Sequence, residues 1–214
     1  MKKILNVLVI LVISNMTFSQ TKWKIGVNYS FGFSTLYGNS VNNNSSNGTN
    51  LTLDYSLKTS LGTGFKIERK ISDKLNLVGS ISYIQKGASF DASNSSTKPS
   101  FKLNYIDFNL GIKRYFSSNE NWFAGLNIVE STLLSSYRMD IYGGSNLSKD
   151  IKKMDYGFNL NLGRDFKTKR DDFIQINLFF TQGFNQLFQG AISKNGIQGK
   201  NMIGGIQLGY LIGK

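Results

Sequence analysis

Residues 56–90 read SLKTSLGTGFKIERKISDKLNLVGSISYIQKGASF, and this stretch decides the fold. Apolar residues alternate with small or charged residues on both sides of a polar break at Ile71–Lys74. A period of two over this length is typical of a strand with one apolar face. Each half is also longer than a soluble strand of about 5–6 residues. The stretch therefore predicts a hairpin of two long antiparallel strands.

The same alternation recurs along the chain. Further alternating segments lie at 23–35, 101–116, 122–130, 155–163, 174–181 and 205–213. A phase slip near Tyr105–Ile106 indicates a β-bulge. Long polar segments at 39–54, 91–100, 139–152 and 186–200 alternate with short turns. This pattern is typical of outer-membrane barrels. We predict an all-β fold: an eight-stranded antiparallel up-and-down transmembrane β-barrel with short periplasmic turns and four long extracellular loops.

A secreted lipocalin-like barrel also has eight antiparallel strands, but its apolar face lies inside. The polar face here carries mostly Gly, Ser, Asn and Thr, which fit the narrow interior of eight strands. A water-exposed face would carry more Lys and Glu. The opposite face carries more Phe, Tyr, Leu and Ile than such a lumen could hold. Both features favour the membrane barrel over the soluble one.

The N-terminus has the pattern of a secretory signal peptide. Lys2 and Lys3 precede an apolar run at 4–13, and Thr17 and Ser19 are the small residues before a cleavage site at Gln20. No other stretch approaches ~20 continuous apolar residues, so any spanning structure must be made of strands. We expect residues 1–19 to be the signal peptide and residues 20–214 to form a barrel domain in the cell outer membrane.

Residue counts limit the chemistry. The 214 residues include no cysteine and no histidine, which excludes disulfides, Ser–His–Asp triads and most zinc sites. We interpret the adjacent Asp171 and Asp172 as solvated charges at a turn. We therefore expect no catalytic residues, no cofactor and no metal. The formal net charge of +12 favours an anionic membrane surface as partner, rather than nucleic acid, for an exported chain.

Several charged residues inside the strands fall on the polar face. Buried charges persist only when they are paired and hydrogen-bonded. We therefore expect a lumen charge cluster in which Asp107, the closest to mid-strand, has a basic partner; charges near strand ends could instead be hydrated. The predicted members are Lys58, Lys66, Glu68, Lys86, Asp107, Lys113, Asp155 and Asp165.

Five residues are expected to anchor the barrel at its periplasmic end. Trp23 and Trp122 begin strands that run upward, while Arg69, Arg114 and Arg164 lie near the ends of downward strands, on the apolar face. A lipid-facing arginine costs ~2–4 kcal/mol at the bilayer midplane but only ~0–1 kcal/mol near the interface. Tryptophan prefers the same depth. The sequence thus predicts a membrane-interface belt.

Lysines also lie in or beside the long loops. A basic rim of this kind would meet the phosphates of lipopolysaccharide among the outer-membrane lipids, with ordinary solvated lysines as the alternative interpretation. The residues are Lys98, Lys102, Lys149, Lys152, Lys153, Lys194 and Lys200.

Five short motifs lie along the chain: SDKLNL at 72–77 at the first turn, YIQKGA at 83–88 at a strand end, and KLNYI at 102–106, KRYF at 113–116 and YGFNLNLG at 156–163 further on. In these motifs the chain resembles the PorT-like outer-membrane β-barrel family of Gram-negative bacteria. The resemblance implies insertion by the barrel-assembly machinery, whose C-terminal signal is matched by Gln207, Gly209 and Ile212. Some members of that family assist protein secretion across the outer membrane.

Two functions stay open at this point. The first is an integral barrel with a structural or surface-interaction role, a lumen filled by polar side chains, and loops that bind partners such as an envelope protein. The second is a component of an outer-membrane transport or protein-secretion system. Eight strands leave little room for an open channel, which disfavours a conducting pore.

Overall fold

The computed structural model describes residues 23–38, 41–42, 51–52, 54–91, 100–116, 121–140, 143–146, 149–189 and 198–213. The expected signal peptide, Lys98 and Lys194 lie outside these residues. In the part of the chain that is described, no helix is long and apolar enough to cross a membrane.

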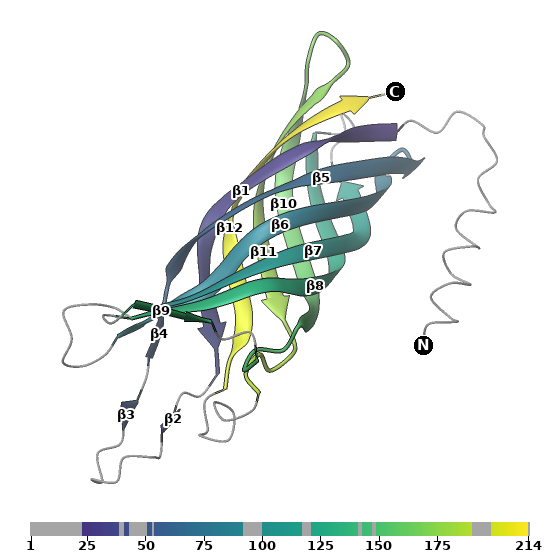
Figure 1. Cartoon of the computed structure of the whole chain (residues 1–214). Helices are drawn as coiled ribbons and strands as arrows, with labels where there is room; N and C mark the ends of the chain where they lie inside the picture. Colours follow the sequence, from purple (N-terminus) through teal and green to yellow (C-terminus); the bar gives the residue numbers. More distant parts are fainter. Residues whose placement is uncertain are drawn as a thin grey trace.

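Eight long strands build the molecule (Figure 1). They are β1 (Trp23–Tyr37), β5 (Lys58–Ser72), β6 (Leu75–Asp91), β7 (Ser100–Tyr115), β8 (Trp122–Asp140), β10 (Met154–Lys167), β11 (Phe173–Gly183) and β12 (Lys200–Gly213). Four shorter strands are β2 (Val41–Asn42), β3 (Leu51–Thr52), β4 (Asp54–Ser56) and β9 (Gly143–Asn146).

Each long strand pairs antiparallel with its two neighbours, and the ring is closed. The order is β1-β5-β6-β7-β8-β10-β11-β12, and β12 pairs back onto β1 from Lys24 opposite Gly213 to Tyr37 opposite Lys200. The predicted eight-stranded up-and-down barrel is therefore confirmed. β1 begins and β12 ends at one end, where the turns at 73–74 and 169–170 also lie; we call it the short-turn end. The opposite end, with β4 and β9, is the long-loop end (Figure 1).

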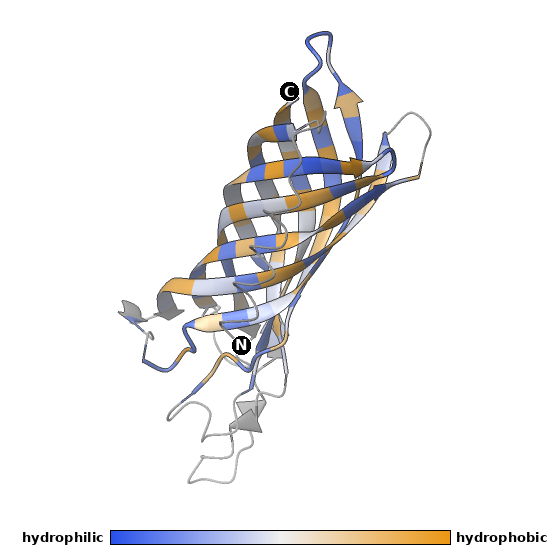
Figure 2. Cartoon of the chain, turned by 90° about the vertical axis from the view of Figure 1, so that its right-hand side faces the viewer, coloured by the Kyte–Doolittle hydropathy of each residue, from blue (hydrophilic) through white to orange (hydrophobic). Residues whose placement is uncertain are grey.

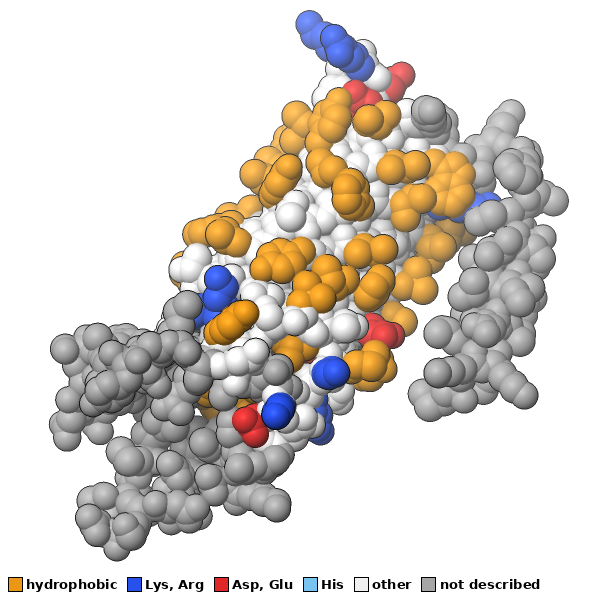
Figure 3. Space-filling model, in the orientation of Figure 1, with side chains coloured by type: hydrophobic (Ala, Val, Ile, Leu, Met, Phe, Trp, Pro, Cys, Tyr) orange, Lys and Arg blue, Asp and Glu red, His pale blue; other side chains and the backbone are white. Residues whose placement is uncertain are grey.

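The apolar face of every strand lies outside the barrel. Along β1, Ile25, Phe31 and Phe33 are exposed, whereas Asn28 and Ser34 are buried. Figure 2 shows this alternation as blue and orange bands along the strands, and Figure 3 shows apolar side chains spread over the outer surface. Burial of the polar face inside the ring excludes the lipocalin-like arrangement, because that arrangement would place the apolar face inside.

The seam between β1 and β12 requires glycine. Gly32 lies opposite Gly205, and a Cβ built on Gly205 would be 2.2 Å from the carbonyl oxygen of Phe31. A side chain at this position would therefore push the two strands apart, which is typical of glycine at a tight bend of a small barrel.

One register shift changes which residues of β8 point into the barrel. The register between β7 and β8 shifts between Asn104 and Tyr105, one residue from the predicted bulge. β8 continues to Asp140, although its alternation is lost near Glu130 in the sequence. The apolar–polar alternation ends there for two reasons. Glu130 places a charge on the exposed outer face, and the register shift turns Ser136 to the interior, where it is fully buried.

Candidate functional site

The lumen holds a compact charge cluster near the short-turn end. The Lys113 ammonium on β7 donates to the two Glu68 oxygens on β5 at 3.1 and 3.0 Å, and to Asp165 Oδ2 on β10 at 2.8 Å. At most 2% of any of these three residues is exposed. β8 lies between β7 and β10 in the sheet, so the Lys113 and Asp165 side chains meet inside the barrel, past β8.

Further side chains complete this cluster. Lys66 Nζ lies 3.5 Å from Glu68 Oε1 and donates to Gln175 Oε1 at 2.5 Å, while Gln175 Nε2 donates to Asp165 Oδ1 at 2.9 Å. Lys24 Nζ lies 3.6 Å from Asp165 Oδ2, and the Tyr115 hydroxyl donates to the same oxygen at 2.8 Å. Each of the two carboxylates therefore contacts two lysines.

Lys24, Gln175 and Tyr115 were not among the predicted residues. Lys24 and Gln175 occupy the polar face of their strands, so their parity was a usable signal. The aromatic residues of the lumen could not be predicted from polarity. Phe123, whose ring centroid lies 4.1 Å from Lys113 Nζ, is apolar and yet points inward.

A second charged group lies nearer the long-loop end. Lys86 Nζ on β6 is 2.9 Å from Asp107 Oδ2 on β7 and donates to Ser131 Oγ at 2.9 Å. Lys86 is therefore the basic neighbour of Asp107. Asp155 is buried beside Asn201, whose amide donates to it at 3.0 Å, and among the described residues it has no ion pair within 4.0 Å.

The predicted lumen residues are thus divided between two levels, and Lys58 belongs to neither. Lys58 is half-buried and donates to Ser100 Oγ at 3.0 Å. Strand parity identifies the face on which a charge lies, but not its height in the barrel.

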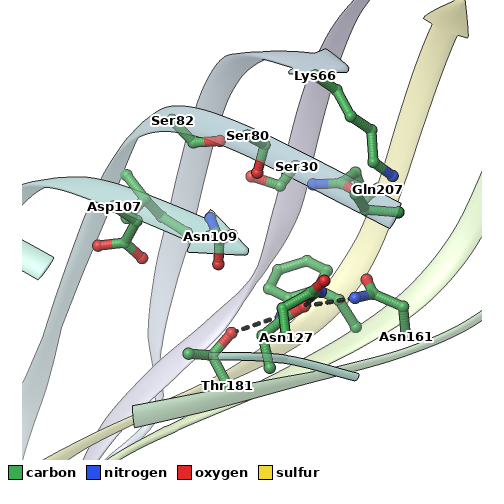
Figure 4. A pocket seen from close by; sticks show the side chains of 14 residues that line it. Ser30, Lys66, Ser80, Ser82, Asp107, Asn109, Asn127, Asn161, Thr181 and Gln207 are labelled. Carbon is green, nitrogen blue, oxygen red and sulfur yellow. Dashed lines mark hydrogen bonds between the residues drawn. The ribbon is translucent and has the colours of Figure 1, made fainter. Parts of the chain in front are cut away.

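A polar cavity of about 40 Å³ separates the two charged groups. Figure 4 shows Lys66 and Asp107 on its wall together with serine, threonine, asparagine and glutamine side chains. Asn127 donates to Asn159 at 2.9 Å, and Asn159 donates to Thr181 at 2.8 Å. A water needs ~10–15 Å³, so the cavity holds only a few waters. Asn127 Oδ1, on this wall, has no hydrogen-bond partner among the described residues and can accept from such a water.

An apolar layer closes the lumen at the long-loop end. Ile151, Leu187 and Phe188 come from outside the strands, yet each is at most 3% exposed. Ile151 forms a β-bridge with Phe188, and Lys152 N donates to Leu187 O at 2.7 Å. These residues pack on a cluster from the barrel strands that includes Leu36, Ile84, Phe101, Leu103 and Ile203. We call Ile151, Leu187 and Phe188 the mouth plug.

The sequence predicted a long polar loop at residues 186–200. For the described part this prediction is wrong, because Leu187 and Phe188 are buried in the apolar cluster at the barrel mouth. Two adjacent apolar residues in a polar segment were the available signal.

The predicted belt residues lie on the outer side at the short-turn end. Arg69, Arg114 and Arg164 are each adjacent in sequence to a residue of the charge cluster that points inward. Because successive side chains of a strand alternate, the three arginines point outward. The Arg69 guanidinium carbon lies 5.3 Å from the Trp23 ring, and that of Arg164 lies 5.5 Å from the Trp122 ring. Both pairs are direct cross-strand neighbours. Arg114 is exposed opposite Ala124.

The turn aspartates have solvent-side partners. Asp171 is 2.6 Å from Lys167, and both side chains are mostly exposed. Asp172 accepts a bond from the Tyr210 hydroxyl at 2.5 Å. Within the described ranges, no group of three or more His, Cys, Asp or Glu residues could hold a metal ion.

A model of the outer membrane protein beta-barrel domain matches residues 18–189. The chain belongs to this family. Its predicted location in the outer membrane is thereby confirmed. No curated protein sequence matches the chain.

Solved barrels share the fold at low sequence identity. The outer membrane protein OprG from Pseudomonas aeruginosa is 10% identical, with a TM-score of 0.59 over 90% of this chain and 95% of that chain. Neisserial surface protein A is 10% identical, with a TM-score of 0.48 over 91% of this chain and 99% of that chain. Ail of Yersinia pestis is 9% identical, with a TM-score of 0.47 over 88% of this chain and 98% of that chain. At such identity the likeness to OprG shows the fold alone.

Proposed function

We propose that the protein is a sealed outer-membrane barrel with a structural or surface-interaction role, which holds its long loops outside the membrane and catalyses no reaction. The observation that carries the proposal is the double closure of the lumen. Buried ion pairs fill it at the short-turn end, the mouth plug covers it at the long-loop end, and the cavity between them is about 40 Å³.

The long-loop end supports the surface part of this role. β6 and β8 contain 17 and 19 residues, whereas a strand needs only ~9–11 to cross a bilayer. β4 pairs with the far end of β6, and β9 with the far end of β8, so the sheet continues beyond the barrel (Figure 1). An extension of this kind places the ends of these strands away from the bilayer, where other envelope proteins can reach them.

Planar-bilayer recording tests the sealed lumen. The purified full chain should insert without producing stepwise conductance, because charged side chains fill the lumen at one end and apolar side chains cover it at the other. A Leu187→Ser/Phe188→Ser variant should also be silent, since Lys113, Glu68 and Asp165 still fill the lower lumen. Sustained stepwise conductance of the unmodified protein would overturn the proposal.

Chemical crosslinking in native outer membranes tests the role. The PorT-like resemblance makes a secretion apparatus the alternative assignment. Stable recovery of a secretion-machine component with the full chain would replace our proposal by that alternative. Recovery of the barrel alone, or with a different envelope protein, is the result that we expect.

A further inference from the structure

The outer surface becomes polar before the strands end on one side of the barrel. Gln85 on β6, Asn104 on β7 and Ser135 on β8 lie side by side in register. Gln85 Nε2 donates to Asn104 Oδ1 at 3.3 Å, and Asn104 Nδ2 donates to Ser135 Oγ at 2.8 Å. Their side of the sheet is the outer one, because the neighbouring residues Ile84, Tyr105 and Ser136 are buried inside; Gln85 and Ser135 are partly exposed, and Asn104 between them is only 9% exposed.

Glu130 lies five residues before Ser135 on β8, below this polar row and at the upper edge of the apolar surface. It is exposed on β8 between Phe108 of β7 and Tyr156 of β10, both of which are exposed. At the usual rise of a tilted strand it stands about 20 Å above Trp122 along the membrane normal. The apolar band of such barrels is about 25 Å tall, and charges are tolerated near its edges. On this side, Glu130 and the polar row therefore mark where lipid headgroups begin.

Three lysines lie at the level of this polar row, on both sides of β8: one is two residues above Ser135, and the other two are beside Leu133, two residues below it. Lys102 of β7 pairs with Tyr137 of β8. Lys152 and Lys153 are exposed, and Leu133 N donates to Lys153 O at 2.7 Å, which holds their segment against β8. We call Lys102, Lys152 and Lys153 the lysine patch. Figure 3 shows basic side chains along the border of the apolar band at this end.

We propose that the lysine patch binds the phosphorylated headgroup of an outer-leaflet glycolipid, lipopolysaccharide, while its acyl chains lie on the apolar surface below. The depth matches, because the lysines lie between two residues below and two residues above Ser135, at the level of the polar row, and Phe108, Ile128 and Tyr156 offer exposed apolar area beneath them. The charge also matches, because a cation near an anionic lipid surface gains ~1 kcal/mol. The inference does not depend on the state of the lumen.

A binding titration with matched variants tests this site. The full chain, folded in neutral detergent at low salt, is titrated with lipopolysaccharide and with its dephosphorylated form, and complexes are counted by native mass spectrometry. The test variant is Lys102→Gln/Lys152→Gln/Lys153→Gln. The control, Lys167→Gln/Lys169→Gln/Arg170→Gln, removes the same charge at the short-turn end. The heat-modifiable gel shift verifies folding, and the single variant Lys152→Gln replaces the triple variant if the latter does not fold.

We expect the lysine-patch variant to bind lipopolysaccharide at least tenfold more weakly, because each charge contributes roughly a fivefold factor. Removal of the phosphates should weaken binding of the unmodified chain to a similar extent, while the control variant stays within about twofold. Equal losses in the two triple variants would show a general effect of net charge and overturn the site. Competition by millimolar inorganic phosphate would also overturn it, in favour of a free-anion site.

Discussion

Asp107 and Lys86 show how a narrow barrel tolerates charges in its interior. Both side chains are less than 10% exposed, and each supplies the opposite charge within 2.9 Å of the other. Removing one partner of a buried pair leaves the other charge without compensation, which costs about 3–5 kcal/mol, whereas replacing both by apolar groups is often close to neutral. The pair therefore stabilises the barrel only as a unit.

We predict that Asp107→Ala lowers the free energy of unfolding by about 3–5 kcal/mol and weakens the heat-modifiable gel shift, because among the described residues the Lys86 ammonium then keeps only Ser131 as a hydrogen-bond partner. Lys86→Met/Asp107→Leu should recover most of the loss. Urea titration in lipid vesicles measures both. Lys167→Ala, which breaks an exposed pair, is the control and should cost at most about 1 kcal/mol. An unchanged midpoint for Asp107→Ala would contradict this account.

The outer face of strand β10 carries apolar residues in its middle and a charged residue near the short-turn end. Leu160 and Leu162 are exposed in its middle, and Arg164 lies on the same face one step nearer the short-turn end, beside Trp122. Near the interface the arginine stem can lie along apolar surface while the guanidinium reaches headgroup phosphate. We propose on this basis that Trp23, Trp122, Arg69, Arg114 and Arg164 form the interface belt.

The same strand provides a test of the belt. Arg164→Leu should change the free energy of unfolding in phosphatidylcholine vesicles by no more than about 1 kcal/mol, whereas Leu160→Arg should cost about 2–4 kcal/mol, because only the second variant places a charge near the midplane. Urea titration of each variant, monitored by tryptophan fluorescence, gives both free energies of unfolding. If the two variants were equally costly, Arg164 would not lie at the interface.

The complete barrel has two closures of different kinds. The charge cluster joins side chains of barrel strands, whose backbone groups are paired around the closed ring. The mouth plug joins segments outside the strands through a few backbone bonds, such as Leu187 N to Gly199 O at 2.9 Å. Local opening of such segments requires less free energy than unfolding the ring.

We therefore predict that Leu187→Ser/Phe188→Ser leaves a compact, heat-modifiable barrel but makes the chain sensitive to protease added outside intact cells. Polar side chains in the apolar layer favour the open mouth, while the strand pairing is unchanged. Leu57→Ser is the matched control, since Leu57 is 66% exposed and does not belong to the plug. Equal cleavage of the plug variant, the control and the unmodified protein would show that the plug does not hold the mouth closed.

Much of the fold could be predicted because strand alternation is a local property. Successive side chains point to opposite faces of the pleat, so the sequence of β1 alone shows that Phe31 and Phe33 share a face while Asn28 and Ser34 occupy the other. Turn lengths then give the up-and-down topology. The signal peptide and the PorT-like assignment rest on sequence alone and stay predictions.

The heights and partners of the lumen residues were decided by the tertiary structure. Lys113 on β7 meets Asp165 on β10 past the intervening strand β8, and Lys24 and Gln175 join them, only because strand tilt and register bring these positions to one level. Leu187 and Phe188 lie in the mouth because inward residues of several strands together form the apolar cluster on which they pack. Parity depends on each strand alone, whereas register and closure depend on the pairing of all eight strands, which no local pattern encodes.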